Sequence, residues 1–337
     1  MGTGEVPLLA QDQIYRLTTA TFPQPYLRDS LSLNRLNQNR IASLCQASVE
    51  THHPDIVQQF RQGFTSRKPR RAPTQPLRIG YLSHCMRRHS VGWLSRWLIQ
   101  YHDHDRFQFY GYFWNTQTPV RDSLQQWFMD QFDHAHLFGR DSLEIARQIY
   151  QDDIDILIDL DSITADVVSE VMMLKPAPIQ VTWLGWDASG IPAIDYFIAD
   201  PYVLPDHAEA HYSEKICRLP ETYLAVDGFE VGVPTLRRED LGIPADAIVY
   251  WSGQSAYKRH PETVRAQLQI IQAVPNSYLL IKGITDETSI QAYFRQIATE
   301  VGVEGDRLRF LPDVREEEVH RANLGIADVV LDTYPYN

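Results

Sequence analysis

The sequence predicts an α/β protein with two Rossmann-like lobes. From Leu77 onward, short apolar runs rich in Val, Ile and aromatic residues alternate with segments of helical periodicity. This alternation begins again after a polar stretch at residues 223–245. Strands that alternate with helices form a parallel sheet with helices on both faces. A chain of 337 residues is long enough for two such domains, each with its own core.

The first 75 residues differ from the rest and predict a short helical segment followed by a linker. Apolar residues between Leu31 and Leu44 have loose helical spacing, and residues 56–64 continue it on a second helix. Residues 66–76, SRKPRRAPTQP, are typical of a proline-containing connector, and we expect its basic charges to be solvated. No 34-residue repeat is visible, so a tetratricopeptide array is not predicted within this chain.

The first lobe is predicted over residues 76–222. It opens with LRIGYLS at 77–83, whose nearly continuous apolar character is typical of a strand buried on both faces. The elements predicted after it are, in order, helix 91–101, strand 107–113, helix 142–151, strand 154–160, helix 167–174, strand 179–184 and strand 196–199.

The second lobe is predicted over residues 246–337, after a crossover at 223–245 that is polar and contains Gly and Pro. Its predicted elements are strand 247–252, helix 262–273, strand 277–282, helix 289–301, strand 308–311, helix 316–325 and strand 329–332. The same alternation of strand and helix therefore predicts a second parallel sheet.

Composition and charge exclude several classes of function. A net charge of -12 provides no basic field for a nucleic-acid backbone, so we expect no nucleic-acid partner. No apolar run reaches the length of a membrane span, and residues 1–25 show no signal peptide, so no membrane partner is expected. The three cysteines, Cys45, Cys85 and Cys217, lack disulfide-framework or zinc spacing and fit a reducing cytoplasm.

The most informative stretch is APIQVTWLGWDASGIPAIDYFIAD, which predicts two strands around a glycine-containing loop. Together with HYSEKICRLPETY after it, this stretch resembles the catalytic region of the O-GlcNAc transferase (Spindly-like) family, glycosyltransferase family 41. The resemblance runs from about Leu77 to Asn337. It implies a GT-B fold, with the two lobes facing a cleft. It also implies inverting, metal-independent transfer of N-acetylglucosamine from UDP-GlcNAc to Ser/Thr hydroxyls of a protein or peptide, without a further cofactor.

His89 is the first candidate catalytic residue. It lies between a predicted strand and helix in SHCMRRHSVGWL, and an imidazole can take a proton from a hydroxyl near neutral pH. The family has a histidine here, which implies a role as base or acceptor-site residue. This chain departs from the family nearby, with Cys85-Met86 for Asp-Phe and Arg88 for Asn. Tyr150 stands where some members have a histidine.

Lys258 and Gln254 are candidate nucleotide-binding residues, and Lys258 is also a candidate catalytic residue. They lie in WSGQSAYKRHPE, which resembles the family's Phe-x-x-x-(Tyr/Phe)-Lys-x-x-Pro block. A lysine directed at a departing nucleoside diphosphate stabilises the charge that develops on it. A following helix N-terminus adds amide donors. Pattern alone favours a surface lysine. The resemblance instead implies that Lys258 binds the diphosphate and that Gln254 donates to phosphate or sugar.

His320 is the third candidate for binding the nucleotide. It lies in REEEVHRANLGIADVVLDT, which resembles a family helix whose histidine is near the nucleotide base. Animal members have a lysine where this chain has Glu317. We expect the acidic residues 316–318 to be solvated and to complement the dipole of the helix that they begin.

Two alternatives remain open from the sequence. Asp159 and Asp161 are two residues apart on a predicted strand and could hold a divalent ion, as in metal-dependent sugar transferases, although the resemblance implies no metal. The other alternative is a binding homologue without turnover, which the departures at Cys85, Tyr150 and Glu317 favour. The chain stops at LDTYPYN, before a Gly-His-Thr-Thr block of the family. We therefore expect an incomplete second lobe, either in a fragment or in a natural truncation.

Overall fold

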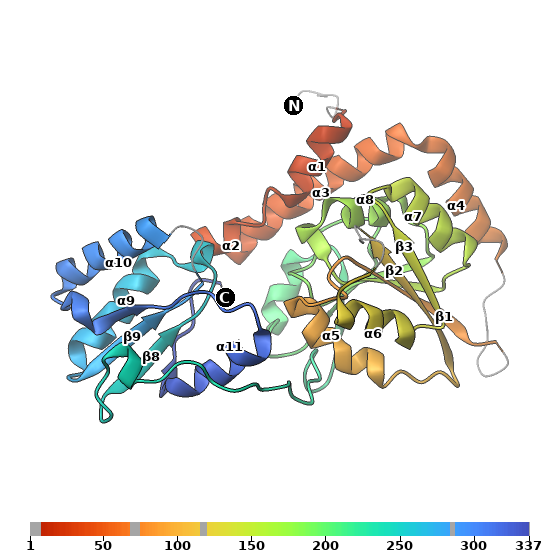
Figure 1. The fold of residues 1–337 in the computed structure, drawn as a ribbon. Helices are drawn as coiled ribbons and strands as arrows, with labels where there is room; N and C mark the ends of the chain where they lie inside the picture. The colour runs from red at the N-terminus through yellow and green to blue at the C-terminus, as the bar shows by residue number, and fades with distance from the viewer. Residues whose placement is uncertain (1–7, 68–74, 115–119, 284–286, 337) are drawn as a thin grey trace, which may run out of the picture. The chain divides into compact units, whose positions relative to one another are not determined.

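The computed structural model describes residues 8–67, 75–114, 120–283 and 287–336. The described residues fall into two compact units (Figure 1). The first unit takes in residues up to 22 and residues 31–227, and the second takes in residues 23–30 and those from 228 onward. Each unit contains a parallel sheet with helices around it, which confirms the predicted α/β class with two Rossmann-like lobes.

Seven parallel strands form the sheet of the first unit, in the order β3-β2-β1-β4-β5-β6-β7. The strands are β1 (Leu77–Ser83), β2 (Phe107–Trp114), β3 (His134–Phe138), β4 (Ile156–Asp159), β5 (Ile179–Thr182), β6 (Tyr196–Ala199) and β7 (Lys215–Arg218). The strand order reverses between β1 and β4. In open parallel sheets, ligands bind in the crevice at such a reversal, outside the carboxyl ends of the strands.

Helices connect these strands and cover the sheet. They are α5 (Ser90–Gln100), α6 (Ser123–Gln131), α7 (Ser142–Gln151) and α8 (Asp166–Leu174). Aspartates begin two of them, because the carboxylates of Asp122 and Asp141 each accept two backbone N–H groups at 3.0 Å. Both caps precede serine, which makes the starts of α6 and α7 local features of the sequence.

The two predicted N-terminal helices are present, and together with one helix that was not predicted they share the core of the first unit. These are α1 (Gln11–Thr19), α3 (Leu31–His52) and α4 (Pro54–Ser66). Their buried side chains Ile14, Val49 and Phe60 belong to one apolar cluster with Ile149 of α7 and Val168 of α8. Burial of these side chains stabilises the helices on the unit, by about 2 kcal/mol for each large apolar group.

The start of the predicted linker is attached to the first sheet. Arg67 donates to the Asp155 carboxylate and to the Ile154 carbonyl, both at 2.7 Å, just before β4. The prediction that the charges of this stretch are solvated is therefore wrong for Arg67, since its side chain keeps 15% exposure. Residues 68–74 lie outside the described part of the chain.

The glycines of the WLG stretch permit two close approaches beside the reversal point. A Cβ added to Gly185 would lie 2.0 Å from the carbonyl oxygen of Leu160, so only glycine lets the loop after β5 pack against the loop after β4. Gly190 has a φ of +72° and donates its N–H to Glu214 at 2.6 Å. The glutamate of HYSEK therefore anchors the glycine loop.

Helix α3 contacts the same loop through Arg35. Arg35 is buried, and its guanidinium lies 3.4 Å from Asp187 and 3.5 Å from Glu214. It also lies 4.4 Å from the ring centroid of Tyr212 and donates to the Ala188 carbonyl. A buried arginine whose guanidinium makes several hydrogen bonds and ion pairs holds its neighbours in one arrangement. The first unit thus presents a rigid loop beside the carboxyl ends of its strands.

Four parallel strands form the sheet of the second unit, in the order β10-β9-β8-β11. They are β8 (Ile248–Ser252), β9 (Ser277–Ile281), β10 (Leu308–Phe310) and β11 (Val329–Val330). The helices are α2 (Gln24–Leu27), α9 (Pro261–Ala273), α10 (Glu287–Val301) and α11 (Glu317–Asn323). As in the first unit, the order reverses beside the first strand, here between β8 and β11.

Most predicted elements coincide with observed ones, including the strand, loop, strand arrangement of β5 and β6. The sequence prediction did not include α1, α2, α6, β3 or β7. The expected crossover contains only a 3-10 turn at 239–241 within residues 223–245. No helix in the described ranges is both long and apolar enough to span a membrane.

Candidate active site

Asp161 organises the reversal point of the first sheet. It is fully buried just beyond β4, and its carboxylate accepts from the Ser83 hydroxyl, the His84 N–H at 3.0 Å and the Trp114 indole at 3.2 Å. Burial alone would raise the pKa of Asp161, but the hydrogen bonds and charge of His84, with Ser83, hold it below its ordinary value. Asp161 is therefore a buried carboxylate with a full set of donors.

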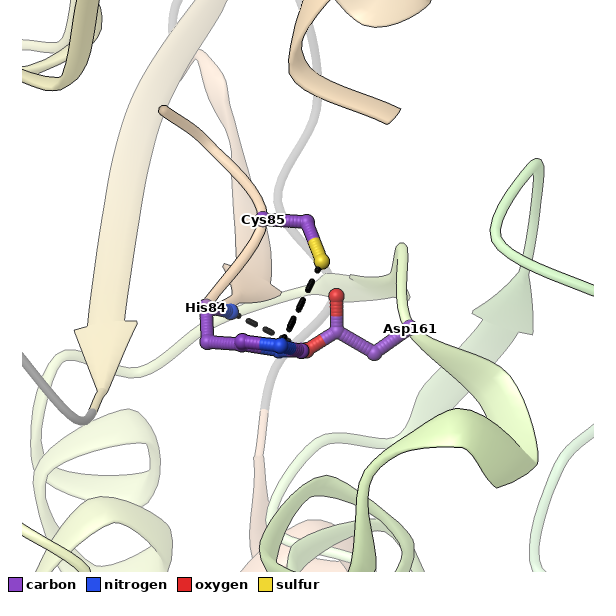
Figure 2. A group of neighbouring side chains, drawn as sticks. All are labelled: His84, Cys85 and Asp161. Carbon is purple, nitrogen blue, oxygen red and sulfur yellow. Dashed lines mark hydrogen bonds and ion pairs between the residues drawn. The ribbon is translucent and has the colours of Figure 1, made fainter. Parts of the chain in front are cut away.

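The imidazole of His84 faces this carboxylate. His84 follows β1, and its Nδ1 lies 2.8 Å from Oδ2 of Asp161 (Figure 2). Its ring also packs against the ring of Trp114, with the centroids 4.8 Å apart. The contact with a carboxylate assigns the proton of the neutral ring to Nδ1, which leaves Nε2 as the acceptor nitrogen.

His89, the predicted catalytic residue, begins α5. Its Nδ1 accepts the Val91 N–H at 3.2 Å, so the neutral ring carries its proton on Nε2. Burial, followed by the charges of Arg87 and His84, lowers the pKa of His89. In this arrangement His89 is a neutral donor beside His84, whose ring centroid is 6.2 Å away.

Asp159 has a different role from Asp161. It accepts the backbone N–H groups of Asp161 at 2.8 Å and Ser162 at 2.9 Å, and the Thr182 hydroxyl at 3.2 Å. Burial, followed by the charge of Asp161, raises the pKa of Asp159 to about 7. The expectation that both aspartates lie on one strand is wrong, because β4 ends at Asp159 and the chain turns there. The two carboxylates consequently have separate sets of donors.

Gln254 and Lys258 lie together at the reversal point of the second sheet. Both follow β8, and Gln254 donates to the Leu331 carbonyl at 2.9 Å and to Asp332 at 3.2 Å, just after β11. Lys258 ends a 3-10 turn, and burial lowers the pKa of its ammonium against the opposing effect of Asp332. No ion pair of Lys258 within 4.0 Å occurs among the described residues.

Arg259 adds a buried cation at the same place. We call the carboxyl ends of the strands at the reversal point of the first sheet the first edge, and those of the second sheet the second edge. Its side chain keeps 7% exposure, and Nη2 donates to the Lys282 carbonyl. In the described part of the chain, Nε and Nη1 have no hydrogen-bond partner, and the guanidinium lies 5.5 Å from the ring centroid of Phe294. Burial lowers the pKa of Arg259 to about 10. A buried cation without a carboxylate partner favours an anionic ligand nearby.

His320 joins this edge through Lys282, which follows β9. The ammonium of Lys282 lies 2.7 Å from Nδ1 of His320 and 4.0 Å from Asp313. Because an ammonium only donates, Nδ1 accepts and the neutral ring carries its proton on Nε2. Burial, followed by the charge of Lys282, lowers the pKa of His320. The ring therefore offers one N–H donor to a ligand.

Three of the four predicted site residues belong to the second unit, where Gln254 and Lys258 follow β8 and His320 contacts Lys282 just after β9. His89 belongs to the first unit. Sequence reasoning missed His84 and Lys282. Both directly follow buried strands, β1 and β9, and that position is a signal for functional side chains in parallel sheets.

Two departures from the family have structural explanations. Tyr150 stacks on Phe60 with ring centroids 4.5 Å apart, so it packs α7 against α4. The Cys85 thiol is buried, and burial together with the charge of Asp161 raises its pKa, which keeps it protonated. Neither side chain therefore supplies the charge that an aspartate or a histidine of the family would bring to its position.

The chain matches the model of glycosyl transferase family 41 over residues 32–231 and 228–337, which is most of its length. Among curated proteins, it is 27% identical over 323 residues to a probable UDP-N-acetylglucosamine–peptide N-acetylglucosaminyltransferase SPINDLY from Solanum lycopersicum. That alignment covers 91% of this chain and 33% of the relative.

A second relative is a probable UDP-N-acetylglucosamine–peptide N-acetylglucosaminyltransferase SEC from Arabidopsis thaliana. It is 31% identical over 269 residues, which cover 76% of this chain and 27% of the relative. The chain thus spans about a third of the length of the curated relatives that it matches.

Among solved structures, an O-GlcNAc transferase from Thermobaculum terrenum superposes with a TM-score of 0.67 at 23% identity. The match covers 97% of this chain and 65% of that chain. At this identity the likeness shows a shared fold, which agrees with the two parallel-sheet units.

Proposed function

The chain belongs to glycosyl transferase family 41, and we propose that it transfers N-acetylglucosamine from UDP-GlcNAc to serine or threonine hydroxyls of a protein or peptide. The names of the SPINDLY and SEC relatives supply the donor and the acceptor class. The single observation that supports this most strongly is the cation-rich edge of the second sheet, in a molecule whose net charge is -12.

In this proposal, the second edge binds the nucleotide. Lys258 and Arg259 are cations without an ion pair within 4.0 Å among the described residues, and a diphosphate provides the missing negative charge. Hydrogen bonds to charged groups contribute about 1.5–3 kcal/mol each. Gln254 donates to phosphate or sugar in exchange for one of its bonds to Leu331 and Asp332, and the Nε2–H of His320 donates to the base.

The sugar is transferred by in-line displacement at its anomeric carbon, with inversion. Lys258 stabilises the charge that develops on the departing UDP, which is the role a metal has in other sugar transferases. We therefore propose that the reaction needs no metal and no further cofactor. His89 acts on the acceptor side as a donor that holds an oxygen of the acceptor.

The test is to titrate UDP into the full chain and to follow transfer from UDP-GlcNAc to peptides, both with and without EDTA. We expect metal-independent binding that Lys258→Ala weakens by about tenfold or more. Transfer should persist in EDTA. A chain whose UDP affinity is unchanged by Lys258→Ala would refute the assignment of the nucleotide site.

Two other functions are outcomes of the same test. Binding of UDP without transfer to any peptide would indicate a non-catalytic homologue, consistent with the departures at Cys85 and Glu317. Loss of transfer in EDTA would indicate a metal-dependent enzyme, for which Asp159 and Asp161 are the candidate ligands. The proposal also places the chain in the cytoplasm, where its widely spaced cysteines stay reduced.

A further inference from the structure

The pair formed by His84 and Asp161 is not used by the roles assigned above. It lies where β1 and β4 end, at the point where the order of the first sheet reverses. Asp161 is fully buried, whereas the side chain of His84 keeps 22% exposure. A buried carboxylate behind a partly exposed imidazole is the arrangement that orients a histidine for proton transfer.

The hydrogen bonds of the pair fix which nitrogen can accept a proton. Nδ1 of His84 donates to Oδ2 of Asp161 at 2.8 Å, so the neutral ring has a lone pair on Nε2. The Trp114 indole and the Ser83 hydroxyl also donate to this carboxylate and hold it in place. Once the ring is protonated, the charge of Asp161 stabilises the imidazolium.

A metal ion explains the geometry less well. His84, Cys85 and Asp161 have potential ligand atoms within 4.8 Å of one another. However, the Cys85 sulfur lies 3.6 Å from Nδ1 and 3.5 Å from Nε2, and so lies over the face of the ring (Figure 2). A metal ion binds an imidazole nitrogen in the plane of the ring, along the lone pair of that nitrogen. The Nδ1 lone-pair direction is also taken by Asp161.

His89 is less suited to accept the proton. Its Nδ1 already accepts the Val91 N–H, so its Nε2 carries a hydrogen and can only donate. For His89 to accept a proton, its Nδ1 would have to release the N–H of Val91, and α5 would lose its N-terminal cap. The two neighbouring histidines thus have opposite tautomers, since Nε2 is the acceptor nitrogen in His84 and the donor nitrogen in His89, and the Cys85 sulfur is the neighbour of both, at 3.5 Å and 3.8 Å.

We propose that His84 is the general base of the transfer and that Asp161 is the residue that positions it, which rests on the proposed glycosyltransferase function. The acceptor O–H gives its proton to Nε2 of His84 while the oxygen forms a bond to the anomeric carbon. The bond from that carbon to the β-phosphate oxygen breaks, and UDP leaves with the electron pair. The imidazolium then releases its proton to water.

The experiment compares His84→Gln and Asp161→Asn with the matched control His207→Gln, an exposed histidine on a 3-10 turn. In the full chain, His84→Gln should lower kcat about 10²- to 10⁴-fold, the usual contribution of a general base. UDP affinity should stay within about twofold. The control should leave both unchanged.

A second measurement reports the tautomer without turnover. ¹⁵N chemical shifts of His84 should show a proton on Nδ1 in the wild type. In Asp161→Asn, the proton should move partly to Nε2, because an amide no longer demands an Nδ1 donor. A purely structural role of Asp161 would not produce that change in a folded variant.

The possible failures can be distinguished. A wild-type chain that binds no UDP and transfers no sugar overturns the proposed function, and the role of His84 with it. Transfer by His84→Gln within about threefold of wild type overturns the role of His84 alone. An Nε2–H tautomer of His84 in the wild type does the same.

Discussion

The two sheet edges have the same topology and opposite electrostatic character. In each sheet the strand order reverses beside the first strand, at β1/β4 and at β8/β11. At the first edge, the buried carboxylate of Asp161 has donors on all sides. At the second, two donor nitrogens of the buried Arg259 guanidinium have no partner in the described part of the chain.

This difference indicates what each edge can do. A charge that is satisfied internally is held in place, so it can orient a neighbouring group such as His84. A cation that lacks an internal partner gains most when an anion binds. The same fold therefore provides a site for proton transfer in one unit and a site for an anionic ligand in the other. Mutations that remove a charge should have opposite consequences at the two edges.

The largest effect is expected from Asp161→Ala. The substitution leaves the donors of Ser83, His84 and Trp114 buried without a partner, which should lower the free energy of unfolding by about 3–5 kcal/mol. Denaturant unfolding measures the loss. Hydrogen exchange of β1 and β4 assigns it to the first unit.

The matched control is Asp130→Ala, because Asp130 is an exposed aspartate of α6 in the same unit. Its effect should stay below about 0.5 kcal/mol. If Asp161→Ala destabilises the chain no more than the control does, the first edge is not held together by its carboxylate.

The second-largest effect is expected from Arg259→Met. Unlike Asp161→Ala, this substitution should not lower the free energy of unfolding. Removing a buried cation without an ion-pair partner should leave stability unchanged or raise it. UDP binding should weaken by about 1–2 kcal/mol, because the positive potential at the second edge falls. Calorimetric titration and denaturant unfolding give the two values.

Arg265→Met is the control for this prediction, since Arg265 is exposed on α9 and paired with Glu300. It should not alter UDP affinity. A large loss of stability in Arg259→Met with unchanged UDP affinity would show that this arginine serves packing and not the ligand.

The smallest effect concerns the pH dependence of stability. The pKa of His320 is lowered by burial and by the charge of Lys282, so the unfolded chain takes up a proton that the folded chain refuses. Stability is therefore complete above the ordinary histidine pKa of about 6.5 and is lost as pH falls below it. Lys282→Met should raise the folded-state pKa of His320 and reduce that loss.

Thermal unfolding at about pH 7.5 and pH 5.5, on either side of the ordinary histidine pKa, measures the change. The fall in Tm should be smaller in Lys282→Met than in wild type, and Lys215→Met at the surface should behave as wild type. An unchanged fall in Tm would mean that Lys282 does not carry its charge beside His320.

The sequence was sufficient to predict the buried strands and helices, but not the two outermost strands of the first sheet. Strand β1 and helix α7 were predicted with their observed limits, because β1 is apolar over nearly its whole length and α7 has apolar residues at helical spacing. The missed β3 (HAHLF) and β7 (KICR) are the edge strands of the sheet. Edge strands are short and polar, so their sequences lack the apolar signal of a buried strand.

Residues of the candidate site were predictable only where a short block of sequence identified them. Lys258 and Gln254 were identified from one block of sequence. The role of His84 depends on Asp161, which lies 77 residues away and contacts it only after the sheet has formed. Sequence also assigned Asp161 to a strand, and the turn after Asp159 that directs it toward His84 was not visible in the pattern.

The central claim, that nucleotide binding and proton transfer are carried by different sheet edges, is tested most directly by UDP affinity. Calorimetric titration of UDP into wild type, Lys258→Ala and His84→Gln should show a loss of about tenfold or more for Lys258→Ala and less than about twofold for His84→Gln. Equal losses in the two variants, or no loss in Lys258→Ala, would contradict the account.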